Sequence, residues 1–252
     1  MRRFLYFVYG VACYALFLGV YAYLAGFLSN VGVPKSIDSA PAGPIGLAVL
    51  VNLSLVTLFA VQHSVMARPA FKRVWRRVVP TPIERSTYVL ASCVVTILLM
   101  WQWRTIDPVV WDLASPALRA VVWTVFAVGW LAVPAVSLLI NHFDLFGARQ
   151  VWLHLKRQDY TPLPFREPSL YKHVRHPLYL GWAVLFWATP TMTAGHALFA
   201  GALTAYMALA ALVEERDLIA HFGADYADYR RRVPMFLPRL RRRSPAVPAA
   251  AE

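Results

Sequence analysis

Residues 172–182 read KHVRHPLYLGW, and the character of this stretch changes at Pro177. Four of the five residues before the proline are basic or histidine, whereas those after it are almost all apolar. Proline is favoured in the first turn of a helix, because a residue there needs no backbone N–H for the helical hydrogen bonds. The stretch therefore predicts an apolar helix that begins at Pro177, with polar side chains gathered beside its start.

The whole chain has the composition of a membrane protein. Of its 252 residues, 59% are hydrophobic and 15% are charged, and the mean hydropathy is +0.50. Soluble domains carry about 25% charged residues. The net charge of +12 could suit nucleic acid, but the basic residues fall between apolar segments, so we expect no nucleic-acid partner. Cys13 and Cys93 lie inside apolar segments, and no HExxH spacing occurs, so we expect neither a disulfide framework nor a metal site.

Several apolar segments are long enough to cross a membrane, which takes about 20 residues for a core about 30 Å thick. Four of them are residues 4–28, 45–66, 87–103 and 119–140. A fifth region, 177–213, is interrupted near Pro190 and predicts a helical hairpin, whose second helix continues to about Phe222 and stops at Gly223. We predict an all-α, polytopic integral membrane bundle of five to six transmembrane helices.

The basic residues predict the topology. Twenty-two of the 25 Lys and Arg residues lie at the N-terminus, in loops 67–86 and 141–176, or after residue 213. Lys and Arg concentrate in cytoplasmic segments of membrane proteins. We therefore expect both termini in the cytosol, and the three basic segments on that side. The amphipathic segment FKRVWRR, residues 71–77, predicts a surface helix that contacts anionic membrane lipid.

The start of the predicted 177 helix has the features of an anion site. Its free backbone N–H groups and positive dipole end would lie beside His176 and Tyr179. Gly181, one turn further, would let a flat ligand approach the helix backbone. The alternative is an interfacial anchor, because Arg, His, Tyr and Trp gather at membrane boundaries without binding a ligand.

A cluster of carboxylates marks the point where the last apolar helix leaves the membrane. Glu214, Glu215 and Asp217 lie within the segment LVEERDL, residues 212–218. Carboxylates near lipid are costly unless they pair with a cation or bind a ligand. We expect a pocket for a cationic ligand here. The alternative is that a member of this set neutralises Arg216 or the arginines at 230–232.

Two further histidines lie at the cytosolic ends of predicted spans. His142 precedes Asp144, Arg149 and Gln150 in the segment INHFDLFGARQ, which makes general acid–base work a candidate role. His63 follows Gln62 near the end of the second span, and Tyr88 begins the third. His63 and Gln62 could equally form hydrogen bonds that hold two membrane helices together.

These motifs together resemble a known group of enzymes. RHPLYLG (175–181), followed about thirty residues later by EERDLIAHFGADYADYRRRVPMFLP (214–238), resembles the membrane methyltransferases that include isoprenylcysteine carboxyl methyltransferases and phospholipid methyltransferases. The segments FAVQHSVMARPAFK, PTPIERSTYVL and NHFDLFGARQVWL look like those of bacterial methanethiol S-methyltransferases, a likeness that covers roughly residues 1–240. The stretch 61–71 is also similar to NnrU-type membrane proteins.

The resemblance implies S-adenosylmethionine as the cofactor. The implied cofactor-binding residues are Gln150, His173, Arg175, His176, Pro177, Tyr179, Gly181, Glu214 and Glu215. By charge, the helix start near Pro177 suits the methionyl carboxylate, and a glutamate suits the methionyl ammonium. No glycine-rich GxGxxG loop of the soluble methyltransferase type is present. We expect residues 1–243 to form one membrane domain whose cofactor half is about 141–238. The Pro/Ala-rich composition of residues 244–252 predicts a disordered tail.

The implied reaction is in-line methyl transfer from the sulfonium of S-adenosylmethionine to a small thiol, most simply methanethiol to dimethyl sulfide. A thiolate is the reactive form, so the thiol proton must be taken up. Our first choice for this role is His142 with Asp144, and the reserves are His63, Tyr88 and Arg149. A dry site open to the cytosol would favour the reaction, because opposite charges attract more strongly away from water.

Other functions remain compatible with the sequence. The same motifs could methylate the carboxylate of an isoprenylated cysteine or a lipid amine. RHPxYxG-like strings also occur in membrane steroid reductases, so an NADPH-dependent membrane reductase is a second alternative, and a non-enzymatic NnrU-like protein is a third. For the methyltransferase we expect the bacterial inner membrane, a small thiol substrate, lipid contact and no obligate protein partner.

Overall fold

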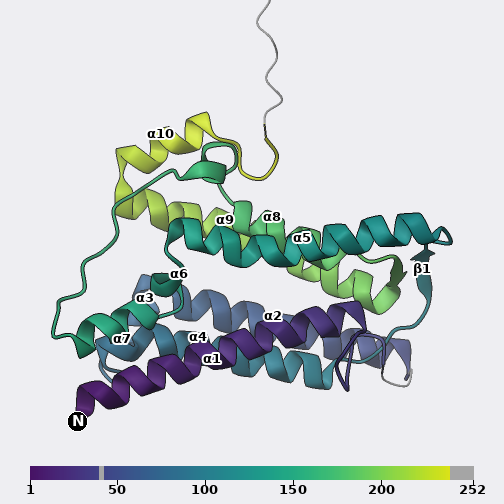
Figure 1. The fold of residues 1–252 in the computed structure, drawn as a ribbon, viewed down its shortest axis with the longest axis horizontal. Helices are drawn as coiled ribbons and strands as arrows, with labels where there is room; N and C mark the ends of the chain where they lie inside the picture. Colours follow the sequence, from purple (N-terminus) through teal and green to yellow (C-terminus); the bar gives the residue numbers. More distant parts are fainter. Residues whose placement is uncertain (40–42, 239–252) are drawn as a thin grey trace, which may run out of the picture.

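The computed structural model describes residues 1–39 and 43–238, and helices dominate it (Figure 1). The described residues contain five helices long and apolar enough to cross a membrane. They are α1 (Arg2–Ser29), α2 (Ile45–Ala67), α4 (Thr81–Gln102), α5 (Pro116–Ile140) and α9 (Ala194–Phe222). The predicted all-α membrane bundle is confirmed. The predicted disordered tail, 244–252, lies outside the described residues.

Shorter elements connect these spans. They are α3 (Pro69–Trp75), α6 (His142–Leu145), α7 (Ala148–Leu155), the 3₁₀ helix η1 (Ser169–Lys172), α8 (Pro177–Trp187) and α10 (Ala224–Arg232). Two short strands, β1 (Val109–Asp112) and β2 (Thr191–Thr193), pair antiparallel, with Val109 opposite Thr193. The strand β2 occupies the interruption that the sequence predicted near Pro190, so α8 and α9 form the two arms of the expected hairpin.

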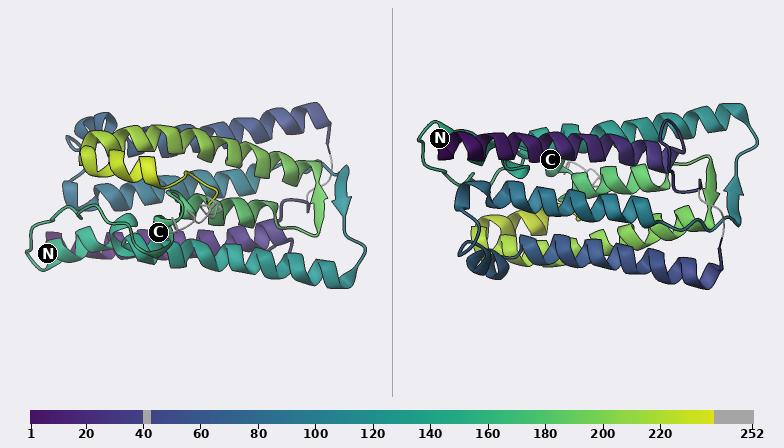
Figure 2. Two further views of the ribbon diagram at one scale, coloured as in Figure 1. Left: turned by 90° about the horizontal axis from the view of Figure 1, so that it is seen from above. Right: turned by 90° about the horizontal axis from the view of Figure 1, so that it is seen from below.

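The long helices form two layers that lie side by side (Figures 1 and 2). In one layer α4 packs against both α1 and α2, and in the other α8 packs against both α5 and α9. Contacts between α2 and α9 join the layers. The N-terminus, α3, α6, α7 and α10 lie at one end of the bundle, and β1 lies at the other (Figure 1). The segment that follows α10 forms hydrogen bonds with the residues just before α8.

The helix α9 is longer than a membrane core requires. Its 29 residues span about 43 Å at about 1.5 Å per residue, against a hydrocarbon core of about 30 Å. The helix therefore exceeds such a core by about 13 Å, and Glu214 and Glu215 lie in its last three turns. Gly223 ends the helix where the sequence predicted, at φ 59° and ψ −127°, a positive-φ conformation that glycine adopts without the steric penalty of a Cβ atom.

Close packing in the second layer depends on a glycine in α5. A Cβ atom on Gly129 would lie 2.9 Å from Val184 Cγ1 and 3.0 Å from the backbone nitrogen of Leu185 in α8. Only glycine permits these two backbones to approach so closely. The second half of α8 is thereby held close to the middle of α5.

Pro134, inside α5, leaves a backbone carbonyl free for a hydrogen bond between the first layer and the second. Proline has no N–H, so the carbonyl of Trp130, one turn earlier, loses its helical partner. The hydroxyl of Tyr21 in α1 donates a hydrogen bond to this carbonyl. The replacement bond positions α1 beside the part of α5 that leads to His142.

Candidate active site

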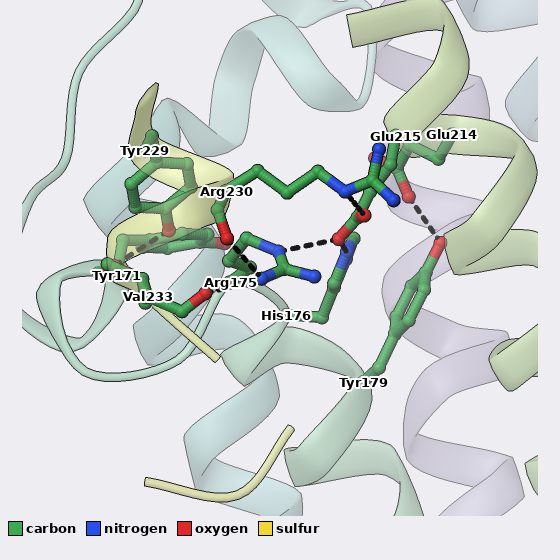
Figure 3. A network of polar contacts seen from close by, with 9 residues as sticks. All are labelled: Tyr171, Arg175, His176, Tyr179, Glu214, Glu215, Tyr229, Arg230 and Val233. Carbon is green, nitrogen blue, oxygen red and sulfur yellow. Dashed lines mark hydrogen bonds and ion pairs between the residues drawn. The ribbon is translucent and has the colours of Figure 1, made fainter. Parts of the chain in front are cut away.

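The start of α8 is organised around the buried carboxylate of Glu215 (Figure 3). The Arg175 guanidinium donates to Glu215 Oε1 at 2.6 Å, and His176 Nε2 lies 3.1 Å from the same oxygen. Arg230 Nε lies 3.2 Å from Oε2. Two guanidinium groups and an imidazole therefore surround Glu215, so its charge is balanced within the protein.

The segment that follows α10 forms hydrogen bonds with the RHP motif, residues 175–177. The backbone N–H of Arg175 donates to Pro234 O at 2.9 Å, and that of His176 donates to Met235 O at 3.1 Å. The Arg175 side chain also donates to the carbonyl oxygens of Arg230 and Val233. These bonds hold the motif and the C-terminal segment together. They also mean that the Arg175 guanidinium donates its hydrogen bonds to acceptors of the protein itself.

A small second core supports this segment. Tyr226, Tyr229 and Val233 are buried together and pack against Phe165 and Phe222. The Tyr229 hydroxyl donates to Tyr171 O at 2.7 Å, which ties α10 to η1 just before the RHP motif. Burial raises the pKa of Tyr229 to about 12, so its hydroxyl keeps its proton and remains a donor at physiological pH.

Glu214 differs from the two carboxylates near it in sequence. Its Oε2 accepts a hydrogen bond from the Tyr179 hydroxyl at 2.7 Å (Figure 3). Asp217 forms an ion pair at 2.8 Å with Arg68, which lies between α2 and α3, and Glu215 is paired with Arg175. Among the described residues, Glu214 alone of these three has no ion pair. A negative charge with only a neutral hydrogen-bond partner is the arrangement that a cationic ligand would complete.

Tyrosines of several helices lie within electrostatic range of this carboxylate. Tyr88 of α4, Tyr179 of α8 and Tyr206 of α9 all interact electrostatically with Glu214. Tyr206 also contacts Ser64 of α2 through its hydroxyl at 3.0 Å. Among the described residues, Tyr179 of the RHPxYxG motif is the tyrosine whose hydroxyl contacts Glu214 directly.

His142 is buried in a hydrogen-bonded relay between α1 and α5. Its Nε2 lies 2.7 Å from the Tyr14 hydroxyl, and its Nδ1 lies 2.6 Å from Ser137 Oγ. Ser137 donates its only hydroxyl proton to Pro134 O at 2.7 Å, so Ser137 Oγ must accept the proton of His142 Nδ1. The neutral ring then offers Nε2 as an acceptor to Tyr14. We name Tyr14, His142 and Ser137 the His142 relay.

His63 lies in a second relay of the same kind. Its Nε2 lies 2.8 Å from the Tyr88 hydroxyl, and its Nδ1 lies 3.2 Å from Ser92 Oγ. Ser92 donates its proton to Tyr88 O at 3.0 Å, so by the same reasoning His63 carries its proton on Nδ1. We name Tyr88, His63 and Ser92 the His63 relay. Both the functional and the helix-joining interpretations of His63 fit these contacts, since the relay joins α2 to α4.

The comparisons with known proteins show the family to which the chain belongs. The family model of the NnrU protein matches residues 51–234. A methanethiol S-methyltransferase of Mycobacterium tuberculosis is 53% identical over 238 residues, which cover 94% of this chain and 98% of the relative. The chain belongs to the NnrU family and to the methanethiol S-methyltransferases. The resemblance found in the sequence is confirmed.

Further relatives of the methanethiol S-methyltransferase family match over similar lengths. The methanethiol S-methyltransferase of Crocosphaera subtropica is 46% identical, covering 94% of this chain and 93% of the relative. Methanethiol S-methyltransferase 2 of Bradyrhizobium diazoefficiens is 52% identical, covering 92% of this chain and 90% of the relative. No solved structure matches the chain.

The structure does not bring His142 and Asp144 together, although the sequence analysis grouped them. Both ring nitrogens of His142 have other partners, and Asp144 accepts from Arg149 at 2.9 Å and from Tyr160 at 3.3 Å. The reason is helical geometry: residues two apart on α6 point about 200° apart. Gln150 donates to Asp144 O at 3.1 Å, so Asp144, Arg149 and Gln150 form one cluster that stabilises the turn into α7.

The remaining predicted residues divide between the site and its surroundings. Pro177 begins α8, and His173, at the end of η1, is exposed to solvent. Gly181 faces α5, where an added Cβ would lie 3.4 Å from Val133 Cγ2, so its small size serves helix packing. The sequence analysis missed Tyr14, Ser137 and Ser92. Each is a polar residue within an apolar span, which is the signal that could have found them.

Proposed function

We propose that this protein methylates methanethiol to dimethyl sulfide with S-adenosylmethionine as the methyl donor. The relatives named methanethiol S-methyltransferase support the substrate. The single observation that supports the donor is Glu214, a carboxylate without an ion pair that accepts from the tyrosine of the RHPxYxG motif. The reacting groups would meet at membrane level, in a site open to the cytosol.

The residues around Glu214 fit such a cofactor. The methionyl ammonium would bind Glu214, and the first-turn amides of α8, at Leu178 and Tyr179, would bind the methionyl carboxylate, because they have no acceptor one turn earlier. Arg175, His176 and Glu215 hold these groups in position through their own network. When bound, S-adenosylmethionine supplies a methyl group activated by a positively charged sulfur.

The thiol must lose its proton to become an effective nucleophile, since a simple alkyl thiol has a pKa above the value of about 8.5 for cysteine. We assign this step to the His142 relay. Burial lowers the pKa of His142, so its ring is neutral at physiological pH and Nε2 can accept a proton. As the S–H bond breaks, the thiol proton passes to the Tyr14 oxygen while the Tyr14 proton moves to His142 Nε2. The products are a thiolate and an imidazolium.

The other predicted residues support these steps. The His63 relay holds Tyr88 in the electrostatic surroundings of Glu214, where it completes the polar wall of the cofactor site. Asp144 and Arg149 fix the turn that follows His142. Because His142 lies beyond the end of α5, its proton can be released at the end of the bundle rather than inside the membrane.

We place the end of the bundle that contains α3, α6, α7 and α10 in the cytosol of a bacterial inner membrane. Most of the Lys and Arg residues are in the segments at this end, which is the distribution of cytoplasmic loops. The N-terminus and the end of α10 lie there as well (Figure 1). Soluble S-adenosylmethionine would then reach the start of α8 directly.

The test is headspace gas chromatography over the purified protein in detergent, supplied with S-adenosylmethionine and methanethiol. We expect dimethyl sulfide to form with repeated turnover, and calorimetry to show binding of S-adenosylhomocysteine. Binding without dimethyl sulfide would exclude methanethiol as the substrate and favour a lipid or isoprenylcysteine acceptor. Binding of NADPH in place of S-adenosylhomocysteine would overturn the proposal in favour of a reductase.

A pair of variants tests the cofactor assignment. Glu214→Gln should weaken binding of S-adenosylhomocysteine about tenfold or more, because a charge-assisted hydrogen bond to the ammonium is lost. Asp217→Asn is the matched control, since it removes the same charge three residues further along α9 from a carboxylate that is paired with Arg68. Equal affinity in both variants would remove Glu214 from the cofactor site.

A further inference from the structure

A small cavity lies between α1, α5 and α6, and nothing in the proposed roles above uses it. Its volume is about 30 Å³, and its exposed wall atoms are apolar. The lining side chains are those of Phe17, Leu18, Tyr21, Val133, Phe146 and His142, together with two neighbours on α5, Pro134 and Ser137. His142 and Ser137, two members of the His142 relay, therefore contribute apolar atoms to the cavity wall.

The size of the cavity restricts what it can hold. A site for one water-sized group needs about 10–15 Å³, so a space of about 30 Å³ accommodates a molecule of two to three non-hydrogen atoms. Methanethiol, with one carbon and one sulfur, is of this size. An apolar cavity remains dry and binds small apolar molecules, whereas water needs several polar partners.

The cavity is also close to the cofactor-binding helix. Val133 packs against Gly181 of α8, where an added Cβ would lie 3.4 Å from the valine. Tyr21 contacts Trp182, the next residue of α8, edge to face with ring centroids 5.5 Å apart. Gly181 and Trp182 follow Tyr179, the partner of Glu214, by less than one helical turn. The cavity therefore adjoins the part of α8 just beyond the proposed cofactor site.

We propose that this cavity binds the alkyl group of the substrate thiol and limits the enzyme to one-carbon thiols and their selenium counterparts. The proposal rests on the proposed function and names its specificity-determining residues. Phe17, Val133 and Phe146 set the size of the space, and the His142 relay lies beside it. Leu18 lines the cavity and is also exposed on the outer surface of α1, so a membrane-soluble thiol can enter from the lipid.

A substitution at Val133 tests the proposal. Val133→Ala enlarges the cavity, so the ratio of kcat/KM for ethanethiol over methanethiol should rise by about tenfold or more, which is the usual effect of one methylene in an apolar pocket. Val136→Ala is the matched control, because Val136 is equally buried on α5 and is not part of the lining. It should leave the ratio unchanged.

A binding measurement separates this inference from the proposed function. Dimethyl sulfide should raise the Tm of the unaltered protein, since a ligand that binds only the folded state stabilises it, whereas diethyl sulfide should raise only that of Val133→Ala. If methanethiol is methylated but Val133→Ala and Val136→Ala show the same ratio, the cavity is not the thiol site. If no thiol is methylated, the proposed function fails. The cavity assignment is tested independently by the Tm values: it is overturned if both sulfides stabilise the unaltered protein and Val133→Ala to the same extent.

Discussion

The His142 relay and the His63 relay have the same hydrogen-bond pattern in different surroundings. In each, a tyrosine contacts Nε2 of the histidine, Nδ1 contacts a serine, and the serine donates to a backbone carbonyl. His63 lies within the membrane span α2, and its tyrosine belongs to the surroundings of Glu214. His142 lies beyond the end of α5 and lines the small apolar cavity.

In both relays the hydrogen bonds fix the tautomer of the histidine, and we infer that the surroundings decide its role. Both histidines present Nε2 as an acceptor, so either could serve as a base by that criterion. Only His142 combines this acceptor with a place beside a cavity of thiol size and a position outside the span. We therefore assign proton transfer to the His142 relay and a supporting role in the cofactor site to the His63 relay.

Substituting asparagine for each histidine in turn should produce the largest difference in turnover between the two relays. His142→Asn should lower turnover at pH 7 by about 100-fold or more, the usual contribution of a general base, while binding of S-adenosylhomocysteine is retained. His63→Asn should lower turnover by less than about tenfold. Initial rates of dimethyl sulfide formation and calorimetry would measure both. Equal losses of rate in the two variants would refute the division of roles.

Removing each tyrosine hydroxyl should separate rate from binding. Tyr14→Phe interrupts the path of the proton and should lower kcat by about tenfold to 100-fold, with unchanged affinity for S-adenosylhomocysteine. Tyr88→Phe should instead weaken that affinity by several-fold, because Tyr88 belongs to the wall around Glu214. Steady-state kinetics and calorimetry on both variants provide the measurement. A loss of affinity in Tyr14→Phe would place the His142 relay in the cofactor site.

The pH dependence follows from the burial of His142. Its pKa is lowered from the ordinary value of about 6.5, so the ring stays neutral, and able to accept a proton, to a lower pH than an exposed histidine would. Turnover should therefore be flat from pH 8 to about pH 6.5 and fall by about tenfold per pH unit below the lowered pKa. A midpoint of the acid limb above 6.5 would contradict this assignment, with His142→Asn as the reference profile.

The serines should give the smallest effect. Ser137→Ala removes the acceptor that keeps the His142 proton on Nδ1, and one hydrogen bond of about 1 kcal/mol corresponds to about fivefold in rate. Ser92→Ala makes the same change in the His63 relay and should leave kcat unaltered. Initial rates at saturating substrates would distinguish them. An equal reduction in both would indicate a general loss of packing between helices.

The long helices could be predicted because each needs only a local apolar run. The segment 45–66 corresponds closely to α2, and the expected stop at Gly223 is where α9 ends. The third span begins earlier than expected, at Thr81 rather than residue 87, because Pro82 starts a helix whose first turn includes the buried Glu84. The strands β1 and β2 were not predicted, since their pairing joins segments about 80 residues apart.

The sequence could predict those features of the candidate site that depend on residue type alone. It could not predict which residues contact one another across the fold. The motif residues Tyr179 and Glu214 were named from the sequence, and the structure places them in contact. Which of the three carboxylates lacks a cation could not be known, because Arg68 and Arg175 come from distant parts of the chain. His142 was grouped with Asp144 by proximity in sequence, whereas its partners are Tyr14 and Ser137.

The most direct test of the central claim is the pH–rate profile of His142→Asn between pH 6.5 and 8.5, measured as dimethyl sulfide formation beside the unaltered protein. If the His142 relay takes the thiol proton, the variant depends on thiolate already present in solution. Its rate should then rise by about tenfold per pH unit, because the thiol pKa lies above about 8.5, and should approach that of the unaltered protein. A variant profile that is flat and merely lower would contradict the claim.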